Sequence, residues 1–175
     1  MQRYQKNLLS DNKNFAVEYV ERLPSQATMF CGHCHVHYEI YVQMGGRRCY
    51  FLKNSIYEIE TGDMVIIAPG VVHKTSNIDK NPHARLLVEF DDRYLGGLSA
   101  FLEEVDVENK LSALLSNGYY IFRNDAYKEE LLKKCCRLIA LEKDENLFER
   151  MKSRLIVAEL LLDVTANSYD QIHTD

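Results

Sequence analysis

Several features that mark common classes of protein are missing from this 175-residue sequence. Tryptophan is absent, although 7 Phe and 11 Tyr leave ample aromatic material for a core. No apolar run approaches the roughly 20 residues that a membrane-spanning helix needs, the best candidate being the short "LIVAELLL". The opening segment, "MQRYQKNLLSDNKNF", lacks the apolar stretch of a secretory signal. We therefore expect a cytoplasmic protein with no membrane partner.

The charge and cysteine counts argue against two further classes. Lys and Arg total 21 against 26 Asp and Glu, which gives a formal net charge of -5. Nucleic-acid binding needs clustered basic residues that release counterions from phosphates, so we expect no DNA-binding surface on this chain. Five cysteines, an odd number, make a poor disulfide framework and fit a reducing compartment. The length is that of one domain with a real core.

The segment "CGHCHVHYE" at residues 31–39 has three interpretations. It contains the CxxCH pattern of covalent haem attachment, a CxxC pair typical of redox or zinc sites, and a row of histidines leading to Glu39. Haem attachment normally takes place outside the cytoplasm and needs a secretory signal. If residues 31–43 form a strand, Cys31 and Cys34 project to opposite faces and cannot hold one metal or one haem together. The histidine row is then the informative feature.

Strand and helix signals divide the chain near Phe90. Before it, "YEIYVQM" and "RCYFL" flank Gly45-Gly46 as in a two-residue hairpin, and "SIYEIE", "MVIIA" and "ARLLVEF" follow between turn residues. This spacing predicts antiparallel meander connections in a small sandwich or barrel. After it, the pattern predicts helices over 93–104, 107–116, 125–142 and 145–167, with a last strand in "GYYIFR". The fold class is mainly β with α.

The last two predicted helices are amphipathic and joined by a short polar linker. Leu131, Cys135 and Leu138 share one stripe of the first helix. The stripe of the second consists of Phe148, Met151, Leu155 and Leu162, with Ala158 between the last two. The hairpin can pack against the barrel of its own chain or form a subunit interface, and both can hold at once. In the second case these four residues of the last helix would form a homodimer contact.

A strand over residues 31–43 would also gather polar groups on one face. That face would carry Cys31, His33, His35, His37, Glu39, Tyr41 and Gln43. The opposite face would be the ordinary buried surface of a sheet. Imidazoles and a carboxylate are costly to bury unless they are paired, solvated or bound to a ligand. The polar face is therefore our candidate binding site.

Two spaced motifs resemble those of the cupin barrels. The first is His33-x-His35-xxx-Glu39 followed by Gly45, and the second leads from Gly62-Asp63 through Pro69-Gly70 to His73 and Asn77. The resemblance implies a cupin-like double-stranded β-helix, or jelly-roll, barrel. It also implies that His33, His35, Glu39 and His73 converge, where they could hold a divalent transition metal such as Zn, Ni, Fe or Mn. A polar, hydrated pocket without a metal is the alternative.

The wording "HCHVHYEIYVQMGG", "TGDMVIIAPGVVH" and "ARLLVEFDDRYL", followed by a helical hairpin, is similar to the effector-binding domain of the arabinose-regulator (AraC) family of transcription regulators. The resemblance covers about residues 28–167. It implies an effector-binding barrel with an N-terminal arm over 1–123 and a dimerising hairpin over 124–175. Its helix-turn-helix DNA-binding domain is absent from this chain, so DNA would be a partner of the full-length protein only.

The resemblance also implies a binding role for the barrel interior. The effector-binding candidates are His33, His35, His37, Glu39, Tyr41, His73 and Arg85. The effector would be a small molecule, and a sugar is the ligand that the family suggests.

Our leading hypothesis is thus an effector-sensing and dimerisation domain with no catalytic residues. The rival is a metal-dependent cupin enzyme of the dioxygenase or sugar isomerase type, which would use the same four ligands. A tightly held metal and turnover lost in His35→Ala would identify the enzyme. A stand-alone binding module is the third hypothesis.

Overall fold

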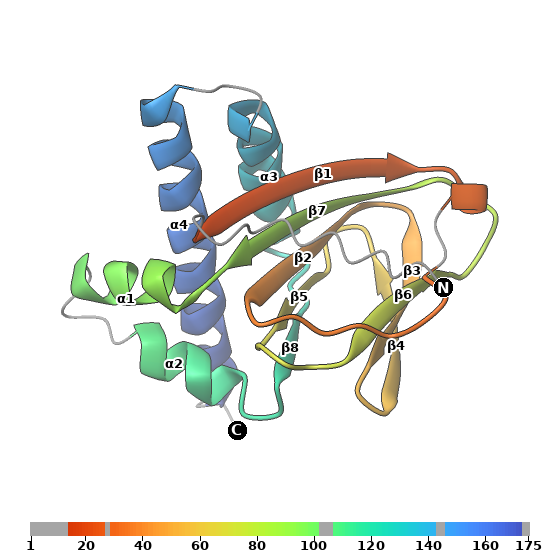
Figure 1. The fold of residues 1–175 in the computed structure, drawn as a ribbon, viewed down its shortest axis with the longest axis horizontal. Helices are drawn as coiled ribbons and strands as arrows, with labels where there is room; N and C mark the ends of the chain where they lie inside the picture. The colour runs from red at the N-terminus through yellow and green to blue at the C-terminus, as the bar shows by residue number, and fades with distance from the viewer. Residues whose placement is uncertain (1–13, 27–28, 102–106, 143–145, 173–175) are drawn as a thin grey trace.

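The computed structural model describes residues 14–26, 29–101, 107–142 and 146–172. The sequence analysis expected an N-terminal arm ahead of the barrel without giving its bounds, and residues 1–13 of that part of the chain lie outside these ranges. The described chain forms two antiparallel sheets with helices on one side (Figure 1). This is the predicted mainly β architecture with a helical hairpin at its C-terminal end.

The larger sheet has five strands and the smaller has three. The strand order of the first is β1 (Phe15–Arg22), β7 (His83–Phe90), β2 (Tyr38–Gly45), β5 (Met64–Ile67) and β8 (Tyr119–Phe122). The second has the order β4 (Ser55–Glu60), β3 (Arg47–Leu52) and β6 (His73–Asn77). A short 3₁₀ helix, Pro24–Gln26, follows β1.

The connections differ from the meander that the sequence predicts. β2 pairs with β5 and β7, whereas β3 pairs with β4 and β6. The Gly45-Gly46 turn is therefore not a hairpin, because it carries the chain from one sheet into the other. Turn residues mark where a strand ends, but they do not determine which strand becomes its neighbour. β1, which the sequence analysis did not identify, pairs with β7 along its whole length.

Alternation along the strands gives the larger sheet two buried faces. Ile40 and Val42 of β2 join a core shared with the helices, whereas Tyr41 lies in a second core between the two sheets. The same division separates Leu86 from Leu87 in β7. The period of two thus places every second side chain of the larger sheet inside the barrel.

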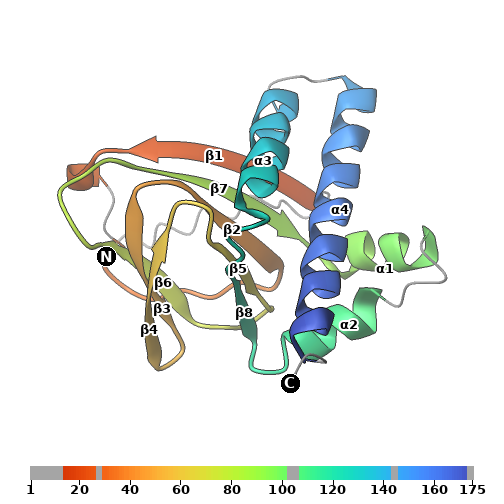
Figure 2. The ribbon, with the colours of Figure 1, turned by 180° about the vertical axis from the view of Figure 1, so that it is seen from behind.

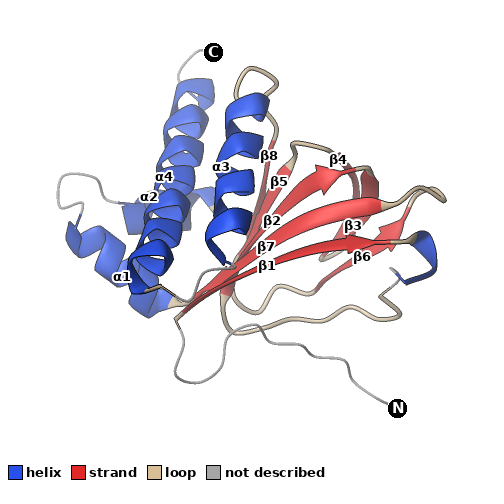
Figure 3. Cartoon of the chain, turned by 90° about the horizontal axis from the view of Figure 1, so that it is seen from above, coloured by secondary structure: helices blue, strands red, loops and turns tan. Residues whose placement is uncertain are grey.

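The helices of the described residues are α1 (Asp92–Phe101), α2 (Val107–Leu114), α3 (Lys128–Glu142) and α4 (Leu147–Ile172). They gather on one side of the larger sheet, with α3 against β1 and with α1 and α2 on the far side of α4 from the strands (Figures 2 and 3). Asn124 caps the turn before α3, where its side-chain oxygen accepts from the Tyr127 amide at 3.1 Å. No described helix is both long and apolar enough to cross a membrane.

The predicted apolar stripes of α3 and α4 differ in burial. Leu131, Cys135 and Leu138 of α3 are fully buried against the sheet. On α4 the core contacts come from a neighbouring face of the helix, and Leu162 is only partly buried at its edge. Phe148, Met151 and Leu155 are 73%, 51% and 56% exposed. The hairpin packs on its own barrel and leaves an apolar face open.

Gly46 occupies a position that only glycine fits. Its φ is +73°, and a Cβ there would lie 2.7 Å from the Pro82 carbonyl oxygen. Gly70 has a similar φ of +80° but no neighbouring atom within 4 Å of a Cβ. A side chain at Gly70 would therefore meet backbone strain alone, whereas a side chain at Gly46 would meet both backbone strain and steric overlap.

Alanine at these two positions should destabilise the fold unequally. We expect Gly70→Ala to cost about 1 kcal/mol, the cost of the left-handed conformation alone. Gly46→Ala should cost about 2 kcal/mol or more because the Pro82 backbone must also move. Urea unfolding of both variants measures the difference, and equal losses would contradict the close approach of Pro82.

Candidate metal and effector site

The segment ahead of β2 crosses from one sheet to the other. The strand expected from residue 31 begins only at Tyr38, and the preceding residues are irregular. His33 instead forms an isolated bridge with His73, with N to O distances of 3.0 and 2.9 Å. The Gly70 amide donates to the His35 carbonyl at 2.8 Å. This pairing with the start of β6 and a bend at residues 36–37 break the alternation that a continuous strand would have.

The crossing brings four side chains together at one end of the barrel. One ligand atom from each of His33, His35, Glu39 and His73 lies within 4.8 Å of all the others. These are the four residues that the cupin resemblance implies. Cys31 and Cys34 are both exposed, form no disulfide and lie outside the cluster.

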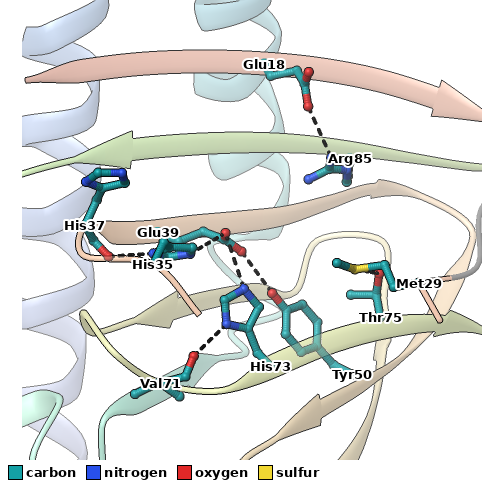
Figure 4. Close-up of polar contacts among 10 residues, drawn as sticks. All are labelled: Glu18, Met29, His35, His37, Glu39, Tyr50, Val71, His73, Thr75 and Arg85. Carbon is teal, nitrogen blue, oxygen red and sulfur yellow. Dashed lines mark hydrogen bonds and ion pairs between the residues drawn. The ribbon is translucent and has the colours of Figure 1, made fainter. Parts of the chain in front are cut away.

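Hydrogen bonds to backbone carbonyls fix two of the imidazole rings. His35 Nδ1 lies 2.8 Å from the His37 carbonyl, and His73 Nδ1 lies 2.9 Å from that of Val71 (Figure 4). A carbonyl only accepts, so each Nδ1 carries the proton and each neutral ring has its lone pair on Nε2. Both Nε2 atoms face Glu39 Oε2, at 3.1 and 3.6 Å. Each Nε2 lone pair and the Glu39 carboxylate are all hydrogen-bond acceptors. They can lie this close together only if a proton or a cation is bound between them.

The charges of the cluster are set by competition between burial and neighbours. Burial favours the neutral acid of Glu39, but the hydrogen bond with His35 and the nearby His73 ring hold the pKa of its carboxyl well below the usual range. Burial also opposes the charged form of His35, but its hydrogen bond with Glu39 raises the His35 pKa. For His33, burial and then the nearby His73 lower the pKa to about 4. His33 Nδ1 is buried and has no hydrogen-bond partner, so it is a neutral donor atom with a free ligand position.

Two further residues belong to this end of the barrel. Tyr50 of β3 donates its hydroxyl to Glu39 Oε1 at 3.0 Å, and burial raises its own pKa well above the usual value. Glu89 of β7 is buried directly opposite Glu39. The sequence analysis missed both. Alternation in "RRCYFL" could have placed Tyr50 inside the barrel, but Glu89 lies in a strand whose partner was not predicted.

The remaining effector candidates lie in different surroundings. Tyr41 is buried between the sheets and donates its hydroxyl to Gln43 Oε1 at 2.8 Å. Arg85 forms an ion pair with Glu18 at 3.1 Å (Figure 4). The His37 ring lies outside the cluster, as the cupin resemblance implies, but not on one face of a continuous strand, because residues 36–37 form a bend. It stacks on the His35 ring with centroids 5.8 Å apart, and its carbonyl contacts His35 Nδ1. Its role as an effector residue stays a prediction.

Comparison with known families identifies the family of this chain. The sequence matches the model of the AraC-like ligand binding domain over residues 15–160. The chain belongs to this family. A search of curated proteins returns no match.

Solved structures show the same fold at low sequence identity. ToxT from Vibrio cholerae O395, bound to (E)-4-(8-methylnaphthalen-1-yl)but-3-enoic acid, is 11% identical with a TM-score of 0.58, covering 89% of this chain and 58% of ToxT. Wild-type ToxT from strain SCE256 with an unsaturated fatty acid is 11% identical with a TM-score of 0.57, covering 87% and 53%. An apo ToxT variant of the same strain is 11% identical and reaches 0.64, covering 89% and 57%. The chain thus spans somewhat more than half of the length of ToxT.

The buried His35–Glu39 pair should stabilise the fold in a defined pH window. Charged Glu39 contributes stability above its ordinary pKa of 4.5, and this is lost as pH falls through the lower folded-state value. The contribution of His35 is complete below its ordinary pKa of 6.5 and is lost as pH rises through the higher folded-state value. Both contributions overlap between these limits.

A double-mutant cycle with His35→Gln and Glu39→Gln, measured by urea unfolding in the presence of a chelator, gives the coupling free energy of the pair. We expect this coupling free energy to be about 1–3 kcal/mol near pH ~5.5 and smaller near pH ~9. The exposed pair Glu129–Lys133, with the same i,i+4 spacing, is the control and should give about 0.5 kcal/mol or less. A coupling between His35 and Glu39 no larger than that of the control would contradict the ion pair.

Proposed function

We propose that this chain is the effector-sensing and dimerisation domain of a cytoplasmic transcription regulator. A small molecule would bind inside the barrel and control DNA binding by a separate helix-turn-helix domain. The observation that carries the proposal is an AraC-like barrel whose interior has a cluster of buried ionisable groups, with Glu39 at its centre. Because buried charges are costly, they are retained mainly where they bind something.

ToxT supports a small molecule as the ligand. Its structures contain a naphthyl butenoic acid and an unsaturated fatty acid. Together with the family, this points to a regulatory rather than an enzymatic role. The ligand of the present chain must favour one state of the domain over another, and it can do so only by its difference in affinity for the two.

We also propose a divalent transition metal at His33, His35, Glu39 and His73. One donor atom from each residue lies within 4.8 Å of the others, and imidazole nitrogens with a carboxylate oxygen are donors that suit a divalent transition metal. The Nδ1 bonds of His35 and His73 to carbonyls are those that metal-bound histidines usually make. The metal would supply positive charge and an open coordination position for an effector atom.

Metal binding should depend on the four side chains of the cluster and not on histidines outside it. The wild-type chain should bind about one equivalent of Zn²⁺ or Ni²⁺, with a rise in melting temperature that a chelator reverses. Glu39→Gln and His73→Gln should each weaken binding about 100-fold or more. His37→Gln is the matched control, since its ring lies outside the cluster. Calorimetric titration checks all four proteins, and wild-type affinity in Glu39→Gln would contradict the site.

The same cluster favours a second function, a metal-dependent cupin enzyme. The two functions differ in what the helices do. Catalysis needs no exposed apolar helix face, whereas a dimeric sensor does. Metal-dependent turnover by the purified chain, lost in His35→Ala, would support the enzyme.

The dimer interface that we propose is the open face of α4 formed by Phe148, Met151 and Leu155, with Leu162 at its buried edge. Apolar side chains this exposed and contiguous are typical of an interaction surface. A groove of about 390 Å³ between α1 and α4, lined in part by Tyr94 and Met151, adjoins the face. It can accept side chains of a second copy packed about a two-fold axis.

Charge placed on this face should separate the subunits. Sedimentation velocity should show a dimer for the wild type and a monomer for the double variant Phe148→Asp with Leu155→Asp. Fused to a DNA-binding domain that requires dimers, the wild type should repress a reporter roughly tenfold better than the variant. Ala140→Asp, at an exposed position of α3, is the control. An unchanged dimer in the double variant would exclude this interface, and a wild-type fusion that never represses would contradict the regulatory role.

A further inference from the structure

The barrel interior has a second polar end, away from the His–Glu cluster. Inward positions of β2 run from Glu39 to Gln43, and those of β6 run from His73 to Asn77. Four residues of strand separate the ends by about 13 Å. The far end is lined by arginines of three strands, Arg22 of β1, Arg48 of β3 and Arg85 of β7.

Arg48 forms the floor of this end. It is almost fully buried, and its guanidinium donates to Thr75 Oγ1 at 2.9 Å and to Asn77 Oδ1. The positive charge of Arg48 acts on the groups around it, and it is one of the charges that lower the pKa of His83.

Arg22, His83 and Arg85 lie together on the two adjoining strands. Arg22 is directly opposite His83, and Arg85 is two residues further along the same face, opposite Gln43. His83 is 5% exposed, and its Nδ1 has no hydrogen-bond partner. Burial and then the three guanidinium groups lower the His83 pKa to about 4, so the ring is neutral at physiological pH.

The protein already places one carboxylate in this cluster. Glu18 pairs with Arg85 at 3.1 Å, and both side chains are partly exposed. Arg22, which is partly exposed as well, makes no ion pair within the described residues. Positive charge therefore exceeds what Glu18 neutralises, at a place that solvent reaches.

We propose that Arg22, Arg85 and His83 form a subsite that binds the carboxylate of a small organic effector. The inference rests on the proposed sensing function and names its ligand class. A guanidinium donates two parallel hydrogen bonds to a carboxylate, and low local solvation strengthens them. His83 Nδ1, which has no partner within the described barrel, would donate one further hydrogen bond to the carboxylate. A neutral sugar would leave the repulsion among the arginines uncompensated, so the cluster favours an acid.

The arginine Nε–Hε signals of the ¹⁵N-labelled chain report binding directly. The probes are benzoate, its uncharged amide benzamide, and inorganic phosphate at constant ionic strength. We expect benzoate to shift the Arg22 and Arg85 signals saturably, and benzamide to leave them unchanged. Shifts of equal size and affinity with phosphate would overturn the organic carboxylate in favour of any anion.

Charge variants should move the benzoate affinity in opposite directions. Arg22→Gln and Arg85→Gln should each weaken it about tenfold, whereas Glu18→Gln should strengthen it because a competing carboxylate is removed. Arg47→Gln is the matched control, since Arg47 precedes Arg48 but points outward to Glu58. Unchanged affinity in both Arg22→Gln and Arg85→Gln, or no saturable shift in the wild type, would overturn the subsite.

The Glu39→Gln variant and the fusion with a DNA-binding domain test this inference and the proposed function separately. Glu39→Gln should lose the metal and keep benzoate binding, because the clusters lie at opposite ends of the barrel. If benzoate binds as expected but reporter repression never depends on the barrel, the subsite stands and the sensing function fails. If the fused dimer works but no carboxylate shifts the arginine signals, the subsite alone fails.

Discussion

The buried negative charge of Glu39 is the constraint around which this end of the barrel is organised. A carboxylate inside a protein needs compensating donors, and here they arrive from three separate segments. His35 comes from the irregular crossing, His73 from β6 and Tyr50 from β3. The backbone bridge between His33 and His73 ties the crossing to the smaller sheet. The cluster therefore exists only when both sheets are closed on each other.

The same strands connect the barrel interior to the helical layer. In β2, Glu39 and Tyr41 face the interior, whereas Ile40 and Val42 pack in the core shared with α3 and α4. A shift of β2 on ligand binding would reach the helices through direct packing. Close-packed interiors transmit such shifts because they have no room to absorb them. α4, which carries the exposed side chains of Phe148, Met151 and Leu155, belongs to that helical layer.

Charge is segregated along the barrel. One end holds Glu39 among imidazoles, and the other holds three guanidinium groups with Glu18 at its edge. The tyrosines at positions 41 and 50 lie between them, with ring centroids 5.0 Å apart. The core between the sheets also contains aliphatic side chains such as Leu52, Ile59 and Leu87, so the polar groups are confined to its ends. Polar ends that are costly to bury indicate a barrel shaped by what it binds.

Sequence by itself determined the local features of this protein. Alternation and turn residues gave the strands around Tyr41 and Tyr50, amphipathic spacing gave α3 and α4, and the cupin spacing indicated all four members of the His–Glu cluster. These signals depend on neighbours along the chain, so they survive without knowledge of the fold. The spacing could not show that His37 leaves the row, because the bend at residues 36–37 comes from pairing with distant His73.

Tertiary structure decided which strands became neighbours. Pairing of β1 with β7 placed Arg22 beside His83, and closure of the two sheets set Arg48 of β3 near them. None of the three belonged to a recognisable motif. The exposed part of the α4 stripe was likewise fixed by which face the sheet covered. Long-range pairing depends on the packing of the whole domain, and no local pattern records it.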